Sequence, residues 1–277
     1  MIVPHPDILS PSDDTPLWRY MDFTKFVALL DKQALYFCRG DILKDLDPYE
    51  GSYTKGEIEF LDAQAQMLFK GKPEVQYQVF SELNRRNSMT MLGMVFVNCW
   101  HANYYESIAM WRVFTAANTG IAIKTDYNSL NNSLSGVSKD IFAGVVQYID
   151  HYGNIVQNAA GQGFIPITRK NLAYQYEQEV RLMIMHVDEK PRYEDLVIKG
   201  VQVTQALPSS IPGMNLPVNL NELIHDIYVD PKADPWFVEL VGEVFNTYKN
   251  KHSLHIAPRI IKSKLSANDL ELTSASN

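Results

Sequence analysis

The sequence is poor in the features that mark several large classes of protein. Its 277 residues include only two cysteines. No run of apolar residues approaches the roughly 20 that a membrane-spanning helix needs. The first residues, MIVPHPDILSPSDD, contain neither the basic start nor the apolar core of a secretory signal. We therefore expect a cytoplasmic protein without a membrane partner.

Familiar catalytic signatures are missing as well. The chain has no glycine-rich phosphate loop, no HExxH pair and no GxSxG elbow. Its seven histidines are scattered and its cysteines are not paired at zinc spacing, so we expect no metal site and no required cofactor. The net charge of -7 disfavours broad binding to nucleic acid, because an acidic chain repels a polyanion.

The two cysteines, Cys38 and Cys99, end the apolar runs LYFC and MVFVNC. A disulfide framework is not expected from two cysteines in a chain of this length, which favours buried, reduced thiols. The alternative is a nucleophilic Cys99 beside His101, since positions 99 and 101 share one face of a strand. No third member of such a catalytic triad is evident in the sequence.

The composition, 46% hydrophobic and 21% charged, is that of an ordinary globular protein with ample material for a core. Strand-like and helix-like segments do not alternate regularly, which disfavours a doubly wound parallel sheet. We predict an α+β fold with a mixed or antiparallel central sheet. Residues 1–265 are expected to form one domain with a helical insertion at about 55–92, and residues 266–277 a flexible tail.

Periodicity, capping residues and turn signals predict the individual elements. Helices are expected from Asp22 or Thr24 onward, in two segments of 57–90 divided near Pro73, and at 105–117, 167–179 and 234–249. Strands are expected at 16–21, 34–38, 91–100, 119–126, 141–150, 179–187, 197–206, 223–231 and 255–263.

One stretch, NCWHANYYESIAMWRVFTAANTGIAIKTD at residues 98–126, mixes bulky aromatics with polar groups. Trp and Tyr offer flat faces with a polar tip, which suits a ligand that carries a ring. In the bland interpretation Ser107 caps a helix, Glu106 favours its dipole and Trp111 is core. The sharper hypothesis is one wall of a ligand cleft, formed by Trp100, His101, Tyr105, Glu106, Ser107 and Trp111.

A second stretch, YQYEQEVRLMI, places Glu177, Glu179 and Arg181 on one face of a predicted strand and apolar residues on the other. Such a charged stripe is either a solvated edge with an ion pair or the opposite, carboxylate-bearing wall of the cleft. Two shorter motifs add candidates. In PLWRYMDF, Arg19 or Tyr20 either belongs to an edge strand or lines a cleft. In DLDPYEG, Asp47 and Glu50 either belong to a capped turn or hold a ribose hydroxyl or a cation.

The ordered set of LYFCRGDILKDLDPYEG, CWHANYYESIAMWRVF, GIAI, VVQYID and YQYEQEVRL resembles the domain of unknown function 2971 family, which is mostly bacterial. The resemblance runs from about Trp18 to Arg181, and more loosely to Asp230. This family supplies no established activity. It favours a bacterial protein.

The order of the pieces is also similar to the ADP-ribosyltransferase superfamily, which carries an Arg or His, then a Ser or Tyr, then a Glu on successive strands. The matching positions are Arg19 or Tyr20, then Ser107 or Tyr105, then Glu179 with Glu177. The superfamily's Ser-Thr-Ser strand and early His have no counterpart here.

This second resemblance implies an ADP-ribosyltransferase-like fold and NAD as substrate. It implies catalytic roles for Glu179, Glu177 and Arg19. Glu179 would stabilise an oxocarbenium-like ribose, Arg19 would hold the pyrophosphate, and Trp100, Trp111 or Tyr105 would sandwich a ring. A role in defence, for example against phage, is a further expectation from the superfamily.

Two alternatives stay open at the level of sequence. The same cleft can serve a non-catalytic sensor or interaction module that binds a nucleotide or a peptide. In that case Glu177 and Arg181 form a structural ion pair. A metal-dependent nuclease would instead need converging carboxylates, for which Asp47, Glu50, Glu106 and Glu179 are the candidates.

Overall fold

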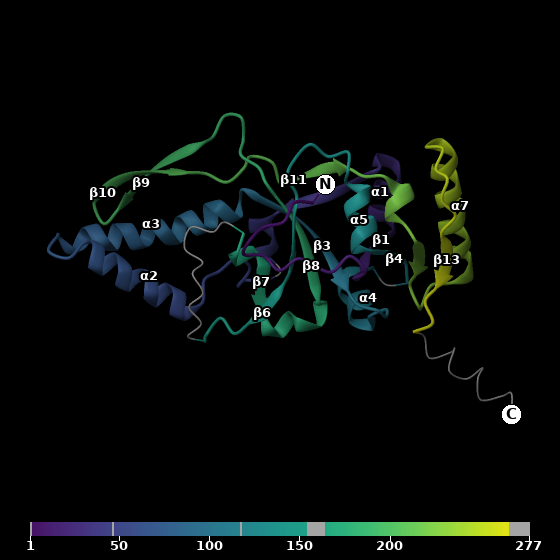
Figure 1. The fold of residues 1–277 in the computed structure, drawn as a ribbon, viewed down its shortest axis with the longest axis horizontal. Coiled ribbons are helices and arrows are strands. Elements are labelled where there is room, and N and C mark those ends of the chain that lie inside the picture. Colours follow the sequence, from purple (N-terminus) through teal and green to yellow (C-terminus); the bar gives the residue numbers. More distant parts are fainter. Residues whose placement is uncertain (1, 46, 117, 154–163, 266–277) are drawn as a thin grey trace, which may run out of the picture.

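The computed structural model describes residues 2–45, 47–116, 118–153 and 164–265. Nine strands form the central sheet, and β3 is its hub (Figure 1). All neighbouring pairs in this sheet are antiparallel except β12 and β13, which confirms the prediction of a mixed, mostly antiparallel sheet. Its path is β11 (Gly213–Pro217), β2 (Ala34–Arg39), β3 (Val95–Ala102), β1 (Pro16–Asp22), β4 (Gly120–Asp126), β12 (Asp226–Val229) and β13 (Arg259–Lys262), with β8 (Glu179–Met185) beside β3 and β5 (Phe142–Val145) beside β8.

The sheet forks at β3. One edge of β3 is paired along residues 95–101 with β8, whereas the other edge is shared by two strands. Strand β2 pairs at residues 96 and 97, and β1 pairs at residues 101 and 102. In the gap between them, side chains replace the missing ladder bonds. The Arg19 guanidinium donates to the carbonyl oxygen of Cys99 at 3.3 Å, and the Asn98 amide donates to the carbonyl oxygen of Tyr36 at 2.9 Å.

The two faces of the sheet bury different clusters of side chains. On the first, which we call the core face, the main apolar cluster packs under four helices, with Trp100 and Phe96 of β3 among its members. On the second, the site face, a smaller aromatic cluster lies under α4. The helices over the core face are α1 (Phe23–Lys32), α5 (Tyr127–Ser133), α6 (Leu220–Leu223) and α7 (Pro235–Lys251), and the helix over the site face is α4 (Ile108–Phe114).

A lobe projects from one end of the molecule, opposite α7 (Figure 1). It contains α2 (Lys55–Leu68), α3 (Glu74–Leu92) and the hairpin of β9 (Tyr193–Ile198) and β10 (Val201–Ala206). The predicted pair of helices is confirmed, with Pro73 directly before α3. The hairpin is fastened to α3 by Thr90, whose hydroxyl donates to the carbonyl oxygen of Ala206 at 3.1 Å and accepts from the Gln205 amide at 3.0 Å.

Two other predicted elements are wrong in detail. The strand expected at 197–206 is the second half of that hairpin, because Lys199 and Gly200 turn the chain. The helix expected at 167–179 is replaced by 3₁₀ helices η2 (Pro166–Thr168) and η3 (Leu172–Glu177) on either side of β7 (Arg169–Asn171). The Asn171 side chain accepts from the Ala173 amide and so begins a turn, and Gln178 ends η3 in the left-handed region, at φ 40°.

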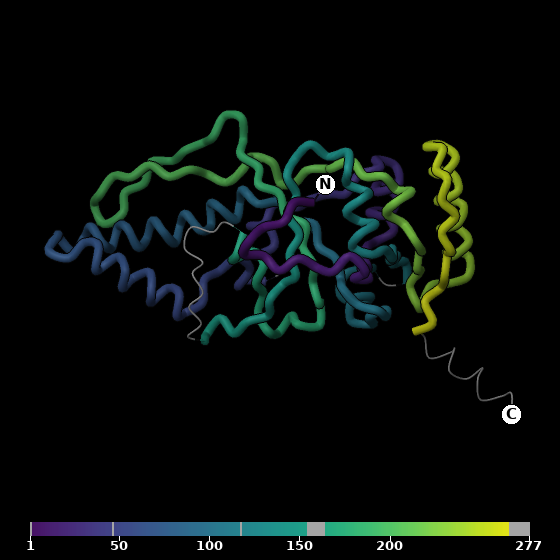
Figure 2. Tube along the Cα trace, viewed as in Figure 1, coloured from purple at the N-terminus to yellow at the C-terminus, as the bar shows by residue number. Residues whose placement is uncertain are grey.

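The N-terminal segment runs beside the β5 edge of the sheet (Figure 2). The Val3 amide donates to the carbonyl oxygen of Ile141, and the Val145 amide donates to that of Leu9, each at 2.8 Å. This segment therefore covers an edge that would otherwise be open. Beyond Val145 the predicted strand 141–150 breaks into β6 (Gln147–Ile149), which pairs with β7. A further 3₁₀ helix is η1 (Gly40–Asp45).

Two sequence-based expectations concern the limits of the chain. Among the described residues, no helix combines the length and the apolar character that crossing a bilayer requires. The tail expected at 266–277 lies outside the described residues. The assignment of residues 1–265 to one domain stays a prediction.

Candidate functional site

Arg181 is the centre of a buried ion network on the site face. It lies opposite Cys99 of β3 and is 1% exposed. Its guanidinium is bidentate to Glu179, at 2.9 and 2.8 Å, and bidentate to Glu50. It also donates to the carbonyl oxygen of Ile167 at 2.6 Å. Five donor contacts match the five N–H groups of an arginine, so Arg181 has no donor left for a ligand.

The DPYEG turn brings Glu50 to Arg181 across 131 positions of sequence. The Asp47 carboxylate accepts from the Tyr49 amide at 2.9 Å, which forms a tight Asx turn. Gly51 follows in the left-handed region at φ 62°, where a Cβ would lie 2.7 Å from the side chain of Leu92. The turn thus accounts for the sequence motif, and Glu50 is 1% exposed beneath it.

Lys170 joins Glu177 to the same network. Its ammonium donates to the Glu177 carboxylate at 2.5 Å and lies 3.6 Å from the Glu179 carboxylate. Burial opposes ionisation of Glu179, but Arg181 and Lys170 outweigh it and lower the pKa of Glu179 to about 2. Burial and the charge of Glu179 raise the pKa of Glu177, and Lys170 offsets them only in part. The pKa values of two neighbouring carboxyl groups are therefore shifted in opposite directions.

His101 connects this network to the aromatic cluster. It lies opposite Glu179 in the ladder, and its Nδ1 is 2.6 Å from the carbonyl oxygen of Glu177. Because a carbonyl only accepts, Nδ1 carries the proton and Nε2 carries the lone pair. Burial lowers the pKa of His101, which keeps the ring neutral. Nε2 is buried and has no hydrogen-bond partner among the described residues.

The Tyr20 ring lies against both His101 and Trp111, at centroid distances of 6.0 and 5.0 Å. Its hydroxyl accepts from the Ser107 amide at 2.9 Å. The Trp111 indole donates to Glu106 at 3.1 Å, and the Ser107 hydroxyl accepts from the Met110 amide and so caps α4. The structure thus links Glu106, Ser107 and Trp111 to Tyr20, and Tyr20 to His101, which in turn contacts Glu177.

Two candidates lie on the other side of the sheet. Trp100 points into the core face, where it is 2% exposed and donates to Asn98 at 2.7 Å. Arg19 lies over the Trp100 ring at 5.6 Å, and burial lowers its pKa to about 10. Strand alternation separates both residues from His101 and Glu179 by the thickness of β3. The prediction that Trp100 and Arg19 share a cleft with Glu179 is therefore wrong.

The remaining candidates occupy separate positions. Tyr105 lies in the loop before α4 and is 78% exposed, whereas Asp47 is 1% exposed within its turn. Glu177 ends η3 rather than lying on β8, so it shares the site with Glu179 through Lys170 and not through strand alternation. Burial and the neighbouring charge of Glu179 raise the pKa of Cys99 well above its ordinary value, which disfavours the nucleophilic alternative.

Sequence reasoning missed several members of the site. Lys170 bridges the two carboxylates, and the Tyr148 hydroxyl accepts from the Glu179 amide at 2.8 Å. Arg169 pairs with Glu57 at 2.7 Å, and Glu57 also completes a capping box with Thr54 at the start of α2. The pattern Thr-x-x-Glu before a helix was visible in the sequence, whereas the partners of Glu57 and Glu179 depend on the three-dimensional fold.

The four carboxylates considered for a metal do not converge. Glu50 and Glu179 both face Arg181, Glu106 faces the Trp111 indole, and Asp47 accepts from the Tyr49 amide within its turn. No group of three or more His, Cys, Asp or Glu side chains is placed to hold a metal ion in the part of the chain that the structure describes. Comparison with family models, with curated proteins and with solved structures finds no match to this chain. Both family resemblances therefore stay predictions.

Proposed function

We propose that the chain binds NAD or a related nucleotide at the site face and cleaves its N-glycosidic bond, as an ADP-ribosyltransferase or an NAD glycohydrolase. One observation carries the proposal: Glu177 and Glu179 lie on one lysine, yet their pKa values are shifted in opposite directions. Pairs of carboxyl groups driven apart in this way are the mark of acid–base assignments in active sites. The ADP-ribosyltransferase-like fold is part of the same proposal, supported by the mixed, mostly antiparallel central sheet.

Glu177, rather than Glu179, is the carboxylate that acts on the substrate. Both oxygens of Glu179 accept from Arg181, so that carboxylate is committed to the network. Glu177 lies between two exposed neighbours, Tyr176 and Gln178. As the bond to nicotinamide breaks, the ribose develops positive charge, and a carboxylate beside it stabilises that charge. Glu179 is then a positioning residue, which fixes Lys170 and through it Glu177.

His101 and the tyrosines complete the arrangement. The Nε2 lone pair of His101 accepts the proton of the attacking hydroxyl group, whose oxygen forms the new bond to the ribose while nicotinamide leaves with the bonding electrons. The exposed rings of Tyr105 and Tyr176, at 78% and 42%, supply flat faces for nicotinamide or adenine. This chemistry requires no metal and no cofactor, and NAD is the substrate.

The test compares nicotinamide release from NAD by the wild type and by Glu177→Gln. We expect a loss of about 100-fold or more, the usual contribution of a positioned acid–base group. Glu177→Gln should keep the NAD-induced rise in the unfolding midpoint, because a ligand that binds only the folded state raises it by mass action. Glu243→Gln, at an exposed position of α7, is the matched control and should release nicotinamide at the wild-type rate.

A non-catalytic module is the second candidate, favoured by the saturation of Arg181 with five contacts. Such a module would show the NAD-induced rise in midpoint with no nicotinamide release by any variant. If neither millimolar NAD nor a related nucleotide shifts the midpoint of the wild type, the nucleotide-binding proposal is rejected and the network is structural.

A further inference from the structure

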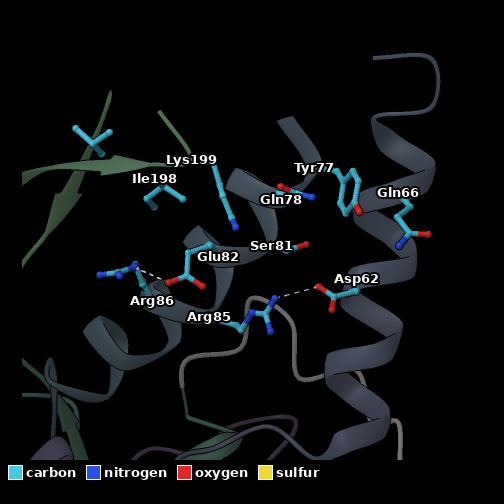
Figure 3. A pocket seen from close by; sticks show the side chains of 11 residues that line it. Asp62, Gln66, Tyr77, Gln78, Ser81, Glu82, Arg85, Arg86, Ile198 and Lys199 are labelled. Atoms are coloured by element: carbon cyan, nitrogen blue, oxygen red, sulfur yellow. Dashed lines mark hydrogen bonds and ion pairs between the residues drawn. The ribbon is translucent and has the colours of Figure 1, made fainter. Parts of the chain in front are cut away.

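A groove lies in the lobe, remote from the site face. It has a volume of about 630 Å³ and runs between α2, α3 and the tip of the β9–β10 hairpin (Figure 3). This volume falls within the range of about 300 to 1,000 Å³ that is typical of small-molecule sites. Helix α3 presents a polar stripe to it at four-residue spacing, from Tyr77 through Ser81 to Arg85.

Ser81 is the buried anchor of the groove. The residue is 6% exposed, and its hydroxyl has no hydrogen-bond partner among the described residues. Leaving a buried hydroxyl unpaired costs free energy, so native proteins normally satisfy such a group. Figure 3 shows Ser81 in the middle of the lining, between Lys199 on one side and Asp62 on the other. A ligand in the groove would satisfy this hydroxyl.

Two cations flank Ser81 from different elements. Arg85 lies on α3, and its only ion pair in the described chain is to Asp62 at 3.7 Å, which is beyond hydrogen-bond distance. Lys199 lies at the hairpin tip and points toward α3 (Figure 3). It has no ion pair with any acidic side chain that the structure describes. Both cations therefore have donors available to an anion.

We propose that this groove binds a small molecule that carries a phosphate group, with the phosphate held by Lys199, Arg85 and the Ser81 hydroxyl. A phosphate dianion matches two cations, and arginine suits phosphate because its fork of N–H groups fits two oxygens. Gln66, Gln78 and the Tyr77 ring also line the groove and suit an uncharged polar body, and the lining carboxylate of Glu82 is paired with Arg86 at 2.9 Å. This site is separate from the NAD site proposed above and does not depend on it.

Titration calorimetry with inorganic phosphate on the full chain tests the proposal, with acetate at equal ionic strength as the carboxylate arm. We expect millimolar phosphate to bind the wild type and acetate not to bind. Lys199→Met and Arg85→Gln should each weaken phosphate binding about tenfold, the effect of losing one hydrogen bond to a charged group. Ser81→Ala should weaken it as well. Lys249→Met, which makes the same charge change at the α7 end of the molecule, should bind as the wild type does.

Three outcomes would overturn the proposal: no binding of phosphate by the wild type, equal binding of acetate, or unchanged binding by Lys199→Met and Arg85→Gln. The two sites are separated by a crossed test. Glu177→Gln should keep phosphate binding, and Lys199→Met should keep the rise in midpoint caused by NAD. Because Lys199 is exposed at a turn, its replacement is not expected to unfold the chain.

Discussion

Glu177 and Glu179 are two positions apart, but their surroundings differ in kind. Glu179 shares both its oxygens with a guanidinium, whereas Glu177 meets one ammonium and the negative charge of Glu179. The ionised form is favoured for Glu179 and disfavoured for Glu177 relative to an ordinary value of 4.5. Each shift is also a statement about stability, because the folded and unfolded chains then bind protons differently.

We predict a maximum in the free energy of unfolding on the mildly acidic side. Glu177 has a raised pKa, so the folded chain binds its proton more tightly, and stability rises as the pH falls from that pKa toward 4.5. Glu179 has a lowered pKa, so its contribution is complete above 4.5 and is lost as the pH falls from 4.5 to about 2. Urea unfolding over a pH series measures the curve.

Glu177→Gln and Glu179→Gln show which carboxyl group causes each limb of the curve of unfolding free energy against pH. Glu177→Gln should remove the rise on the mildly acidic side and keep the decline at lower pH. Glu179→Gln should flatten the decline and lower stability at neutral pH, since Arg181 then loses an anion. If stability still rises at mildly acidic pH in Glu177→Gln, another group causes the rise, and the raised pKa of Glu177 no longer supports the proposed site.

Among the elements, the β9–β10 hairpin has a lysine, Lys199, at a strained position of its turn. Ile198 pairs with Val201, so Lys199 and Gly200 form a two-residue turn, at φ 51° and 81°. Such a turn needs positive φ at both positions and prefers Asn-Gly, because a left-handed lysine is strained. The chain thus keeps a lysine where asparagine would fold better, which fits a functional role for its ammonium.

Lys199→Asn separates the two roles of this position. We expect it to stabilise the chain by about 0.5 to 1 kcal/mol through relief of the turn. We also expect weaker phosphate binding, because the cation at the groove is lost. Thermal unfolding and calorimetry on the same preparation measure both effects. Lower stability would mean that the lysine side chain stabilises the lobe, and unchanged phosphate binding would remove Lys199 from the proposed site.

For the molecule as a whole, local sequence patterns predicted the secondary structure and the faces of strands better than they predicted contacts between distant segments. Alternation along β8 correctly placed Glu179 and Arg181 on one face, and the same rule, applied to adjacent positions 100 and 101, would have sent Trp100 and His101 to opposite faces. Because Trp100 and His101 are adjacent in sequence, we expected them in one wall of the cleft, but they lie on opposite faces of β3. The contact of Glu50 with Arg181 spans 131 positions, and no local signal in a single sequence specifies such a pairing.

Two arginines of the sheet, the buried Arg181 and the half-buried Arg19, should respond differently to the same change. Arg181 is bidentate to two buried carboxylates on the site face, so Arg181→Met removes the main partner of both and should cost about 3 to 5 kcal/mol. Arg19 lies at the fork on the core face, with one bond to the Cys99 carbonyl and no acidic partner among the described residues. Its burial already disfavours the charge.

Arg19→Met should therefore leave stability within about 1 kcal/mol of the wild type, because the lost hydrogen bond is offset by removal of a poorly solvated charge. Since β3 separates Arg19 from Glu177, nicotinamide release should also be unchanged. Urea unfolding and the release assay, run on Arg19→Met and Arg181→Met together, measure both quantities. If Arg19→Met instead keeps its stability and loses NAD binding, the separation of Arg19 from the nucleotide site by β3 is contradicted.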